Sequence, residues 1–333
     1  MNILITGGAG YIGSHTALVL SQAGHKITIV DNLCNSKAST IDQLSKILGS
    51  PIHFIDGDVR NTTLISKVLK ENQIEAVIHF AGLKSVSESV ANPILYYSNN
   101  VQGSISLIEA MQLNKINTFV FSSSATVYGA PLYLPYDEAH PTSPINPYGN
   151  SKLQVETILK DWANSDPEVK VSILRYFNPV GAHESGLIGE NPNQTPNNLM
   201  PYITKVIGGT LPYLNVYGDD YDTRDGTGER DYIHVMDLAE GHLAALEFLN
   251  NKCGAYVHNL GTGQGTTVLE LIKAFESVNE IKIPFRFSSR REGDLPSYYS
   301  NAKKAFNDLG WKTKRTLEKS CKDTYQYFKN SIG

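Results

Sequence analysis

The sequence predicts an α/β protein with a doubly wound parallel sheet and a smaller, mixed α/β lobe toward the C-terminus. In the first half of the chain, short β-branched runs alternate with longer segments of helical spacing, the element order of strands joined by crossover helices. The runs are apolar at consecutive positions, as expected for strands that helices cover on both faces. The length of 333 residues accommodates one large domain and a smaller one. Together these observations predict a Rossmann-type fold.

The expected strands end where the composition changes, near residue 177. They cover residues 2–6, 26–30, 52–55, 76–80, 118–123 and 171–176. The segment 14–24 has helical spacing and is closed by Gly24. Residues 178–198 are rich in Gly, Pro and Asn, and a loop of this length in a compact protein is usually functional. We therefore expect the sheet domain at 1–177 and a smaller lobe at 178–333, with some chain crossing between the two.

Charge and composition argue against several classes of function. The chain has 29 basic and 33 acidic residues, so nucleic acid is not an expected partner. No apolar run approaches the roughly 20 residues that cross a bilayer, so no membrane partner is expected either. The start MNILITGG lacks a basic n-region and a cleavage site, and we expect no secretion signal. The three cysteines are far apart, which fits neither a disulfide framework nor a metal site and favours the cytoplasm.

The stretch GGAGYIG, residues 7–13, predicts a dinucleotide site because it follows the first strand and opens a helix. Its glycines permit a tight turn, and the helix start offers free N–H groups to a pyrophosphate. A glycine triplet alone is weak evidence, since an ordinary strand-to-helix turn can contain one. Asp31 ends the second strand, 21 residues after Gly10, where its carboxylate would bind ribose hydroxyls and repel a 2′-phosphate. This favours NAD over NADP; a helix cap is the alternative for Asp31.

Other strand ends carry polar or small residues at the same predicted edge of the sheet. Asp58 could contact adenine, and residues 79–82 offer small side chains and open backbone beside the cofactor. Residues 122–124 are serines that close the fifth strand. His53 and His79 are interior to strand patterns, so we interpret both as core or satisfied polar residues rather than catalysts.

A tyrosine precedes a lysine by four residues in three places, and one of them has the surroundings of a catalytic pair. The pairs are Tyr148/Lys152, Tyr299/Lys303 and Tyr325/Lys329. The first begins the helix after the serine-ended strand, 24 residues after Ser124, whereas the other two are interpreted as surface helix spacing. Because residues four apart share a helix face, Lys152 can place positive charge near the Tyr148 hydroxyl.

Catalysis by Tyr148 requires a large change in its pKa. A free phenol titrates near 10, and lowering its pKa to about 7 requires roughly 4 kcal/mol of preference for the phenolate. We expect Lys152 and the positive nicotinamide ring of NAD to supply this preference, so that Tyr148 acts as a general base. Ser124 would hydrogen-bond the same substrate hydroxyl.

Several stretches of the sequence resemble one known family. They are TGGAGYIGSH, DNLCNS, HFAGLKSV, FSSSATVYG, PYGNSK, LRYFNPVGAH, PNNLMPYI, DGTGERDYIHVMD and RREGDLPSYY. From residue 1 to about 325 the chain is similar to the UDP-galactose 4-epimerases of the extended short-chain dehydrogenase/reductase family. Several of these motifs are specific to the epimerases rather than to the wider family.

The resemblance implies chemistry at C4 of a nucleotide sugar, with UDP-galactose and UDP-glucose as substrates. Tyr148 would take the 4′-hydroxyl proton while hydride moves to tightly held NAD; the keto sugar rotates, and hydride returns to the opposite face. Related 4,6-dehydratases typically carry Asp-Glu after their Thr, where this chain has Ala125 and Thr126. Two alternatives stay open: a 4-epimerase of another UDP-sugar (a uronic acid, a pentose or an N-acetylhexosamine) and a non-catalytic NAD-binding sensor.

The motifs and the resemblance together imply three sets of site residues. The catalytic residues would be Tyr148, Lys152 and Ser124. The cofactor set comprises Gly7, Gly10, Tyr11, Ile12, Gly13, Asp31, Asn32, Leu33, Cys34, Asn35, Ser36, Asp58, Val59, Phe80, Ala81, Gly82, Leu83, Lys84, Asn99, Ser124, Tyr148, Lys152 and Phe177. The substrate set comprises Lys84, Ser124, Ala125, Thr126, Tyr148, Asn178, Asn198, Leu199, Tyr217, Arg230, Tyr232, Arg291, Asp294 and Tyr298.

The resemblance also implies roles for individual substrate residues. Arg230 and Arg291 would hold the diphosphate, to which guanidinium groups are well matched, although each could instead form a surface ion pair. Asp294 would bind the uridine ribose, and Tyr217 would lie near the uracil. Tyr298 would narrow the sugar pocket and restrict the substrates to UDP-glucose and UDP-galactose. A homodimer is expected through a bundle that includes the helix near 97–113.

Overall fold

The computed structural model describes residues 1–191, 198–291 and 293–332. Within these residues, the largest sheet has seven parallel strands in the order β11-β6-β5-β4-β1-β2-β3. Its strands are β1 (Asn2–Thr6), β2 (Lys26–Asp31), β3 (His53–Asp56), β4 (Ala76–His79), β5 (Thr118–Ser124), β6 (Lys170–Tyr176) and β11 (Gly254–Leu260). The predicted fold class is therefore confirmed, and the ends of the six predicted strands differ from the observed ends by at most one residue.

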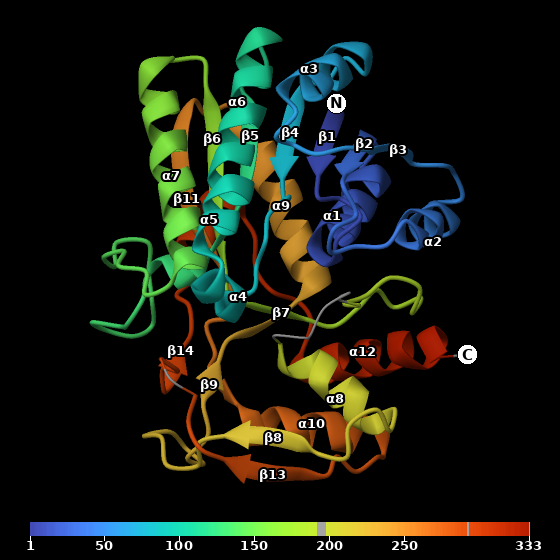
Figure 1. The fold of residues 1–333 in the computed structure, drawn as a ribbon, viewed down its shortest axis with the longest axis vertical. Coiled ribbons are helices and arrows are strands. Elements are labelled where there is room, and N and C mark those ends of the chain that lie inside the picture. Colours follow the sequence, from blue (N-terminus) through green and yellow to red (C-terminus); the bar gives the residue numbers. More distant parts are fainter. Residues whose placement is uncertain (192–197, 292, 333) are drawn as a thin grey trace.

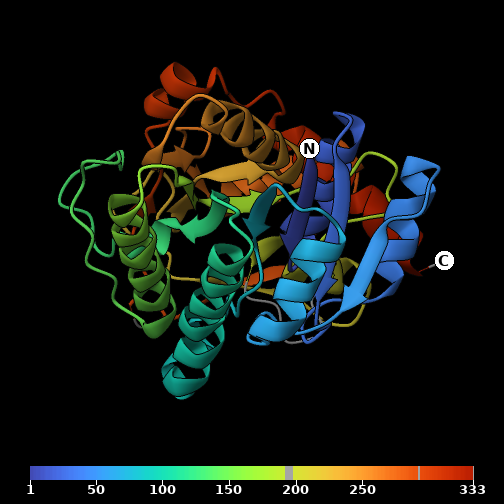
Figure 2. The ribbon, with the colours of Figure 1, turned by 90° about the horizontal axis from the view of Figure 1, so that it is seen from above.

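Helices cover both faces of this sheet, as Figure 2 shows from above. One layer contains α1 (Tyr11–Gln22), α2 (Ser39–Leu48) and α9 (Val235–Leu249), and the other contains α3 (Thr62–Glu71), α6 (Gly103–Leu113) and α7 (Pro147–Ser165). Alternate residues of β1 enter the two cores: Ile3 and Ile5 pack with the first layer, and Leu4 packs with the second. Burial on both faces explains why these strands are apolar at consecutive positions.

The seventh strand and one covering helix come from the second half of the sequence. β11 pairs in parallel with β6, from Gly254 opposite Lys170 to Leu260 opposite Tyr176. α9 packs against α1 in the same core. The chain therefore returns to the sheet after residue 178, which is a crossing of the kind that we expected. The division into 1–177 and 178–333 stays a prediction.

A smaller group of elements lies below the carboxyl ends of the strands in Figure 1. It contains β7 (Asn178–Val180), β8 (Leu214–Tyr217), β9 (Glu229–Arg230), β10 (Tyr232–His234), β12 (Thr266–Thr267), β13 (Phe285–Ser288), β14 (Ser297–Tyr298), α8 (Leu199–Ile207), α10 (Val268–Asn279) and α12 (Leu317–Ile332). Met200, Ile203, Leu271 and Phe275 form part of a separate apolar core in this group. α11 (Lys303–Leu309) packs instead against α9 and β11.

The remaining helical segments lie between β4 and β5 and after β5. They are α4 (Val86–Ala91), α5 (Pro93–Tyr96), the π-helix η1 (Tyr97–Gln102) and the 3₁₀ turn η2 (Ala125–Val127). The helix expected near 97–113 is thus a π-helix followed by α6. None of the helices in the described ranges is both long and apolar enough to cross a membrane.

Three sequence expectations need correction. The loop predicted at 178–198 begins with a strand, β7, because β10 lies beside it and supplies hydrogen-bonding partners; residues 192–197 lie outside the described residues. The helix expected at 14–24 runs instead from Tyr11 to Gln22, directly after the glycine turn. His53 is exposed because β3 is the edge strand, whereas His79 is buried and bonded to Thr6 and Ser104, as predicted.

Candidate active site

The turn between β1 and α1 brings the glycine motif into close contact with neighbouring backbone. Gly7 has φ +72°, and a Cβ on it would lie 2.6 Å from the Ala81 nitrogen. A Cβ on Gly13 would lie 2.4 Å from the Gly7 oxygen. A side chain at Gly7 would collide with the backbone after β4, and a side chain at Gly13 would push α1 away from the end of β1. Gly10 is the N-cap of α1 and provides no side-chain cap, which suits a helix start that receives an anion.

Asp31 and Asp58 end or follow adjacent strands beside this turn. The Asp31 carboxylate accepts hydrogen bonds from the Ala9 N–H at 3.0 Å, the Leu33 N–H at 2.9 Å and the Ser36 hydroxyl at 2.9 Å. It therefore orders the loop after β2 and is not an N-cap, since α2 begins after Ala38. Hydrogen bonds from Arg60 hold the pKa of Asp58 down at about 2, so this carboxylate is ionised.

The glycine turn, the two carboxylates and the start of α7 surround one cavity of about 460 Å³. Every residue of the expected cofactor set lines it except Leu33, Ser124 and Phe177. Leu33 packs against the apolar core beside α1, and Phe177 belongs to a cluster with Tyr128 and Tyr136. Ser124 ends β5, and its hydroxyl accepts a hydrogen bond from the Thr126 hydroxyl at 2.9 Å. The structure thus collects almost the whole expected set, from four strand ends, η1 and α7, around a single space.

Tyr148 and Lys152 occupy the first turns of α7, where they face the end of β5. Asn146 caps this helix by accepting the Gly149 N–H at 2.8 Å, and Pro147 occupies its first position. The Lys152 ammonium donates to the Ser122 carbonyl at 2.7 Å, and its nitrogen lies 6.0 Å from the centre of the Tyr148 ring. The Ser124 side chain is close enough to the Tyr148 hydroxyl to lower its pKa. The three expected catalytic residues are therefore neighbours.

The expected pKa of Tyr148 needs correction for the protein chain by itself. Burial raises the pKa of Tyr148, and the hydrogen bond with Ser124 opposes this only in part. Burial also lowers the pKa of Lys152 to about 8, against the charge of Glu156. Because the ammonium of Lys152 is directed at the Ser122 carbonyl, the chain alone does not make Tyr148 more acidic.

Glu156 is a buried neighbour of the catalytic pair that was not predicted from the sequence. It lies one turn after Lys152 on α7, and its side chain is 0 % exposed. Its carboxylate accepts from the Ser123 hydroxyl at 2.6 Å and from Arg175 on β6 at 2.9 and 2.6 Å. The four-residue spacing from Lys152 is the signal that could have identified it.

The predicted diphosphate and ribose residues form a second cluster, away from the lining of the cavity. Asp294 pairs with Arg230 at 3.2 Å and with Arg291 at 2.9 Å. The Arg291 guanidinium also lies 4.9 Å from the centre of the Tyr217 ring. Both arginines thus form ion pairs, which was the alternative to diphosphate binding. They share one partner, however, and that partner, Asp294, was itself predicted to bind the uridine ribose.

The other substrate candidates lie in several parts of the structure. The Tyr298 ring packs 5.5 Å from Phe177 and 4.8 Å from Tyr136, centre to centre, and its hydroxyl has no hydrogen-bond partner in the described part of the chain. Ala125 is buried in the same aromatic cluster. Lys84 and Asn198 both donate to one oxygen of Glu190, at 3.1 and 2.9 Å. Three further candidates belong to regular secondary structure. Asn178 of β7 pairs with Tyr232 of β10, and Leu199 is the first residue of α8.

The cavity also has lining residues that were not predicted from the sequence. They include Ser122, Tyr176, residues 186–191 and, from α12, Tyr327, Asn330 and Ser331. The length of the loop after residue 178 predicted that the loop is functional, but it did not indicate which of its residues line the cavity. Nothing in the sequence connected the C-terminal helix to the cofactor site.

Comparison with known proteins identifies the family of the chain. A family model described as GDP-mannose 4,6 dehydratase matches residues 4–324. The UDP-glucose 4-epimerase of Pasteurella multocida (strain Pm70) is 53 % identical over 332 residues, which cover 99 % of this chain and 98 % of that one. The Bacillus subtilis (strain 168) UDP-glucose 4-epimerase is 51 % identical over 333 residues, 100 % of this chain and 98 % of that one.

Solved structures give the same result. The Stenotrophomonas maltophila UDP-glucose 4-epimerase, with bound NAD and formylated UDP-arabinopyranose, has a TM-score of 0.98 at 48 % identity and covers 100 % of this chain and 99 % of that one. The Bifidobacterium longum UDP-glucose 4-epimerase, in complex with NAD⁺ and UDP, has a TM-score of 0.96 at 48 % identity and the same coverage. The chain therefore belongs to the UDP-glucose 4-epimerase family of extended short-chain dehydrogenases/reductases.

Proposed function

We propose that this protein interconverts UDP-glucose and UDP-galactose, with NAD as a tightly bound cofactor that is regenerated in each turnover. The observation that carries the proposal is that Tyr148 and Lys152 line the cofactor cavity with Ser124 beside Tyr148, while positions 125 and 126 hold no acid. A site with a base but without an acid for expelling a hydroxyl suits oxidation and reduction at C4 better than dehydration. We therefore interpret the match to a dehydratase family model as a shared fold and not as a shared reaction.

The residues around the cavity fit NAD. Gly7 and Gly13 leave room for close approach of a pyrophosphate to the backbone at the start of α1. Asp31 keeps one oxygen that accepts a single described hydrogen bond, from Ala9, and so has capacity for a ribose hydroxyl. The carboxylate also disfavours a 2′-phosphate at that point, which supports NAD rather than NADP.

In the proposed mechanism, Tyr148 accepts the proton of the 4′-hydroxyl and Ser124 holds that hydroxyl in place. NAD, when bound, supplies a positively charged ring that accepts hydride from C4 and later returns it. Lys152 keeps the helix register by binding the Ser122 carbonyl and adds positive charge in a buried setting. Arg230 and Arg291 would bind the diphosphate, so that the 4-keto sugar rotates while the nucleotide stays fixed. Ligand phosphates would then take over interactions that Asp294 now makes.

Tyr298 supports a narrow sugar pocket. Its ring is held between Phe177 and Tyr136, so it cannot swing aside without displacing buried aromatic groups. We expect no comparable conversion of UDP-N-acetylgalactosamine by the native protein, and we expect Tyr298→Ala to gain it. Equal rates of the native protein on N-acetylated and plain sugars would contradict this restriction.

We further propose a homodimer. Val86, Val90, Ile94 and Leu95 on α4 and α5 are exposed, with Val90 at 63 % and Ile94 at 76 %, next to η1 and α6. A continuous group of exposed apolar side chains on neighbouring helices is typical of an interface. Light scattering should give twice the chain mass, and Ile94→Asp should shift it toward the monomer; a native monomer would contradict the proposal.

We keep the cytoplasm as the proposed location. Cys34, Cys253 and Cys321 are all free thiols in the structure, which suits a reducing compartment. Fractionation of the source cells with an antibody tests this.

The decisive experiment is to incubate the purified protein with UDP-galactose and no added cofactor, and to follow the anomeric protons by NMR. We expect a mixture that favours UDP-glucose. Conversion without added NAD would support both the reaction and a retained cofactor. No conversion even with NAD would contradict these substrates, and a panel of UDP-uronic acids, UDP-pentoses and UDP-N-acetylhexosamines would then test the alternatives.

A further inference from the structure

The outer wall of the cofactor cavity is built from parts of the chain that are remote from the glycine motif. Residues 186–191 and, on α12, Tyr327, Asn330 and Ser331 line the same space as Gly7 to Gly13. In Figure 1, α12 lies across the molecule below the carboxyl ends of β1 and β2. A molecule that fills this cavity is therefore covered on the side opposite the sheet.

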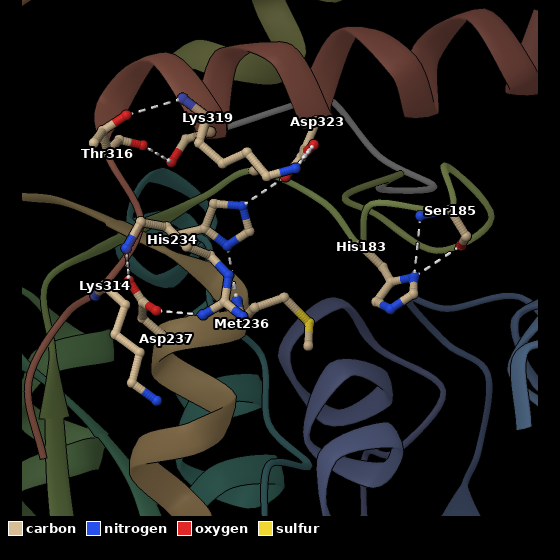
Figure 3. Close-up of polar contacts among 12 residues, drawn as sticks. His183, Ser185, His234, Met236, Asp237, Lys314, Thr316, Lys319 and Asp323 are labelled. Atoms are coloured by element: carbon tan, nitrogen blue, oxygen red, sulfur yellow. Dashed lines mark hydrogen bonds and ion pairs between the residues drawn. The ribbon is translucent and has the colours of Figure 1, made fainter. Parts of the chain in front are cut away.

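The loop in this wall is a small hairpin with its own hydrogen bonds. Ala182 and Gly189 form an antiparallel bridge, and the His183 N–H donates to the Ile188 carbonyl at 3.2 Å. The Gly186 N–H closes the tip by donating to the His183 carbonyl at 2.9 Å. The His183 ring, in turn, contacts the Ser185 hydroxyl at 2.8 Å, as Figure 3 shows. Hairpin 182–189 is thus held by its own hydrogen bonds, and Ile188 anchors it in the apolar core beside α1.

α12 contacts this hairpin through Asn330 and Tyr327. The Asn330 amide donates to the Ser185 carbonyl at 3.3 Å and to the Gly186 carbonyl at 3.1 Å. Gln326 donates to the Asn330 side-chain oxygen at 2.9 Å, which orients the amide nitrogen toward the two carbonyls. A Cβ on Gly189 would lie 2.5 Å from the Tyr327 ring, so hairpin and helix already touch.

The opposite end of α12 is anchored to the fold. The His234 ring accepts the Met236 N–H through Nδ1, so its proton resides on Nε2 and is donated to Asp323 at 3.2 Å. Lys319 binds the same Asp323 at 2.8 Å, and Figure 3 shows these side chains converging between α9 and α12. Just before α12, Arg315 pairs with Asp237 of α9. The first half of α12 is held rigidly, which places its last turns against the hairpin.

We propose that hairpin 182–189 and the last turns of α12 form a clasp that slows the dissociation of NAD, with Asn330 as its latch. The proposal rests on the proposed NAD cofactor and adds residues that neither the motifs nor the relatives' names assign. Its physical basis is that the covered ligand can leave on this side only after the hairpin separates from α12. Separation breaks the two Asn330 hydrogen bonds, while the bond from Lys84 to Glu190 restrains the far end of the loop.

The test uses the holoenzyme loaded with radiolabelled NAD, an excess of unlabelled NAD as chase, and rapid desalting to count retained label. Asn330→Asp is nearly isosteric but replaces the donor with a carboxylate that faces two carbonyls. We expect its NAD dissociation to be roughly tenfold faster, the effect of about two ordinary hydrogen bonds near solvent. Lys322→Gln is the matched control, because it changes the net charge equally at an exposed position on the same helix; its dissociation rate should equal that of the native protein.

A second variant tests the clasp from the hairpin side. Gly189→Ala should also accelerate NAD loss, since its methyl group would press against the Tyr327 ring. Native retention in both Asn330→Asp and Gly189→Ala would overturn the clasp, as would equal acceleration in Asn330→Asp and Lys322→Gln. The assay needs no sugar substrate, so failure of the clasp is distinct from failure of the proposed reaction. A protein that binds no NAD at all would contradict the cofactor and the clasp together.

Discussion

We expect the Tyr148 hydroxyl to contribute to the rate of the reaction as a general acid–base group. It is buried at the start of α7, and its hydroxyl contacts Ser124 at the end of β5. We expect Tyr148→Phe to lower kcat by roughly 10²- to 10⁴-fold, the usual contribution of a general acid–base group. Tyr325→Phe removes the same hydroxyl from another Tyr-x-x-x-Lys pair and should leave kcat unchanged. Similar kcat losses in both variants, measured by coupled assay of UDP-glucose, would contradict the assignment.

Lys152 should give the reaction an alkaline limit. Burial lowers its pKa to about 8, so the ammonium is present below that pH and is lost as the pH rises through it. We expect kcat to fall above about pH 8. Because the charge of Glu156 raises the pKa of Lys152, Glu156→Gln should move this limit to lower pH. Ser123→Ala removes a hydrogen bond to Glu156 but keeps its charge, so its limit should stay; identical pH profiles for Glu156→Gln and the native protein would refute the argument.

At the scale of elements, α7 is held against the sheet by one row of side chains at four-residue spacing. Tyr148 meets Ser124, Lys152 meets the Ser122 carbonyl, and Glu156 meets Ser123. Arg175 extends the row to β6. The register between α7 and β5 therefore positions the hydroxyls that we propose to react, because sliding the helix would break all three contacts.

The buried ion pair in this row should be costly to break. Glu156→Ala leaves the Arg175 guanidinium, which is 3 % exposed, without its carboxylate. We expect the free energy of unfolding to fall by about 3–5 kcal/mol. Lys160, 43 % exposed and 3.7 Å from Glu156, provides the contrast: Lys160→Ala should cost less than about 1 kcal/mol. Urea denaturation measures both, and equal losses would show that burial does not govern the difference.

At the scale of the whole molecule, buried neutral histidines should make the fold sensitive to acid. Burial lowers the pKa of His15 and His79 to about 3 and that of His242 to about 4, below the ordinary value of 6.5. For His79, the charge of Lys152 acts in the same direction. Since the unfolded chain binds these protons first, their contribution is complete above pH 6.5 and is lost as the pH falls toward these values.

We therefore expect the free energy of unfolding to be lower at pH 5 than at pH 7, by on the order of 2 kcal/mol for each such histidine. His79→Gln should reduce the difference in unfolding free energy between pH 5 and pH 7 by the contribution of one buried histidine. His53→Gln, a change at an exposed position on the edge strand, is the matched control. A pH dependence that is the same in His79→Gln and the native protein, measured by urea denaturation, would contradict buried histidine as the origin of the acid sensitivity.

The six strands before residue 177 and the glycine turn were readable from the sequence because their signals are local. Consecutive apolar residues mark a strand buried on both faces, and a glycine motif between strand and helix marks a phosphate-binding turn. The Tyr148/Lys152 pair became distinguishable from the other two pairs because it lies 24 residues after Ser124. Pattern and order along the chain thus determined the fold class and the cofactor edge, and they predicted the place of the proposed reacting groups.

Only the tertiary structure decided what depends on contacts between distant segments. β11 completes the sheet because β6 offers it an open edge, and β7 forms because β10 lies beside it. The pKa of Tyr148 is raised rather than lowered by the chain because burial outweighs a lysine that donates elsewhere. Asn330 reaches the cofactor cavity from α12, near the C-terminus, through anchors such as Asp323 to His234. Such contacts leave no local pattern, since burial and hydrogen bonding arise only when the folded chain brings remote residues together.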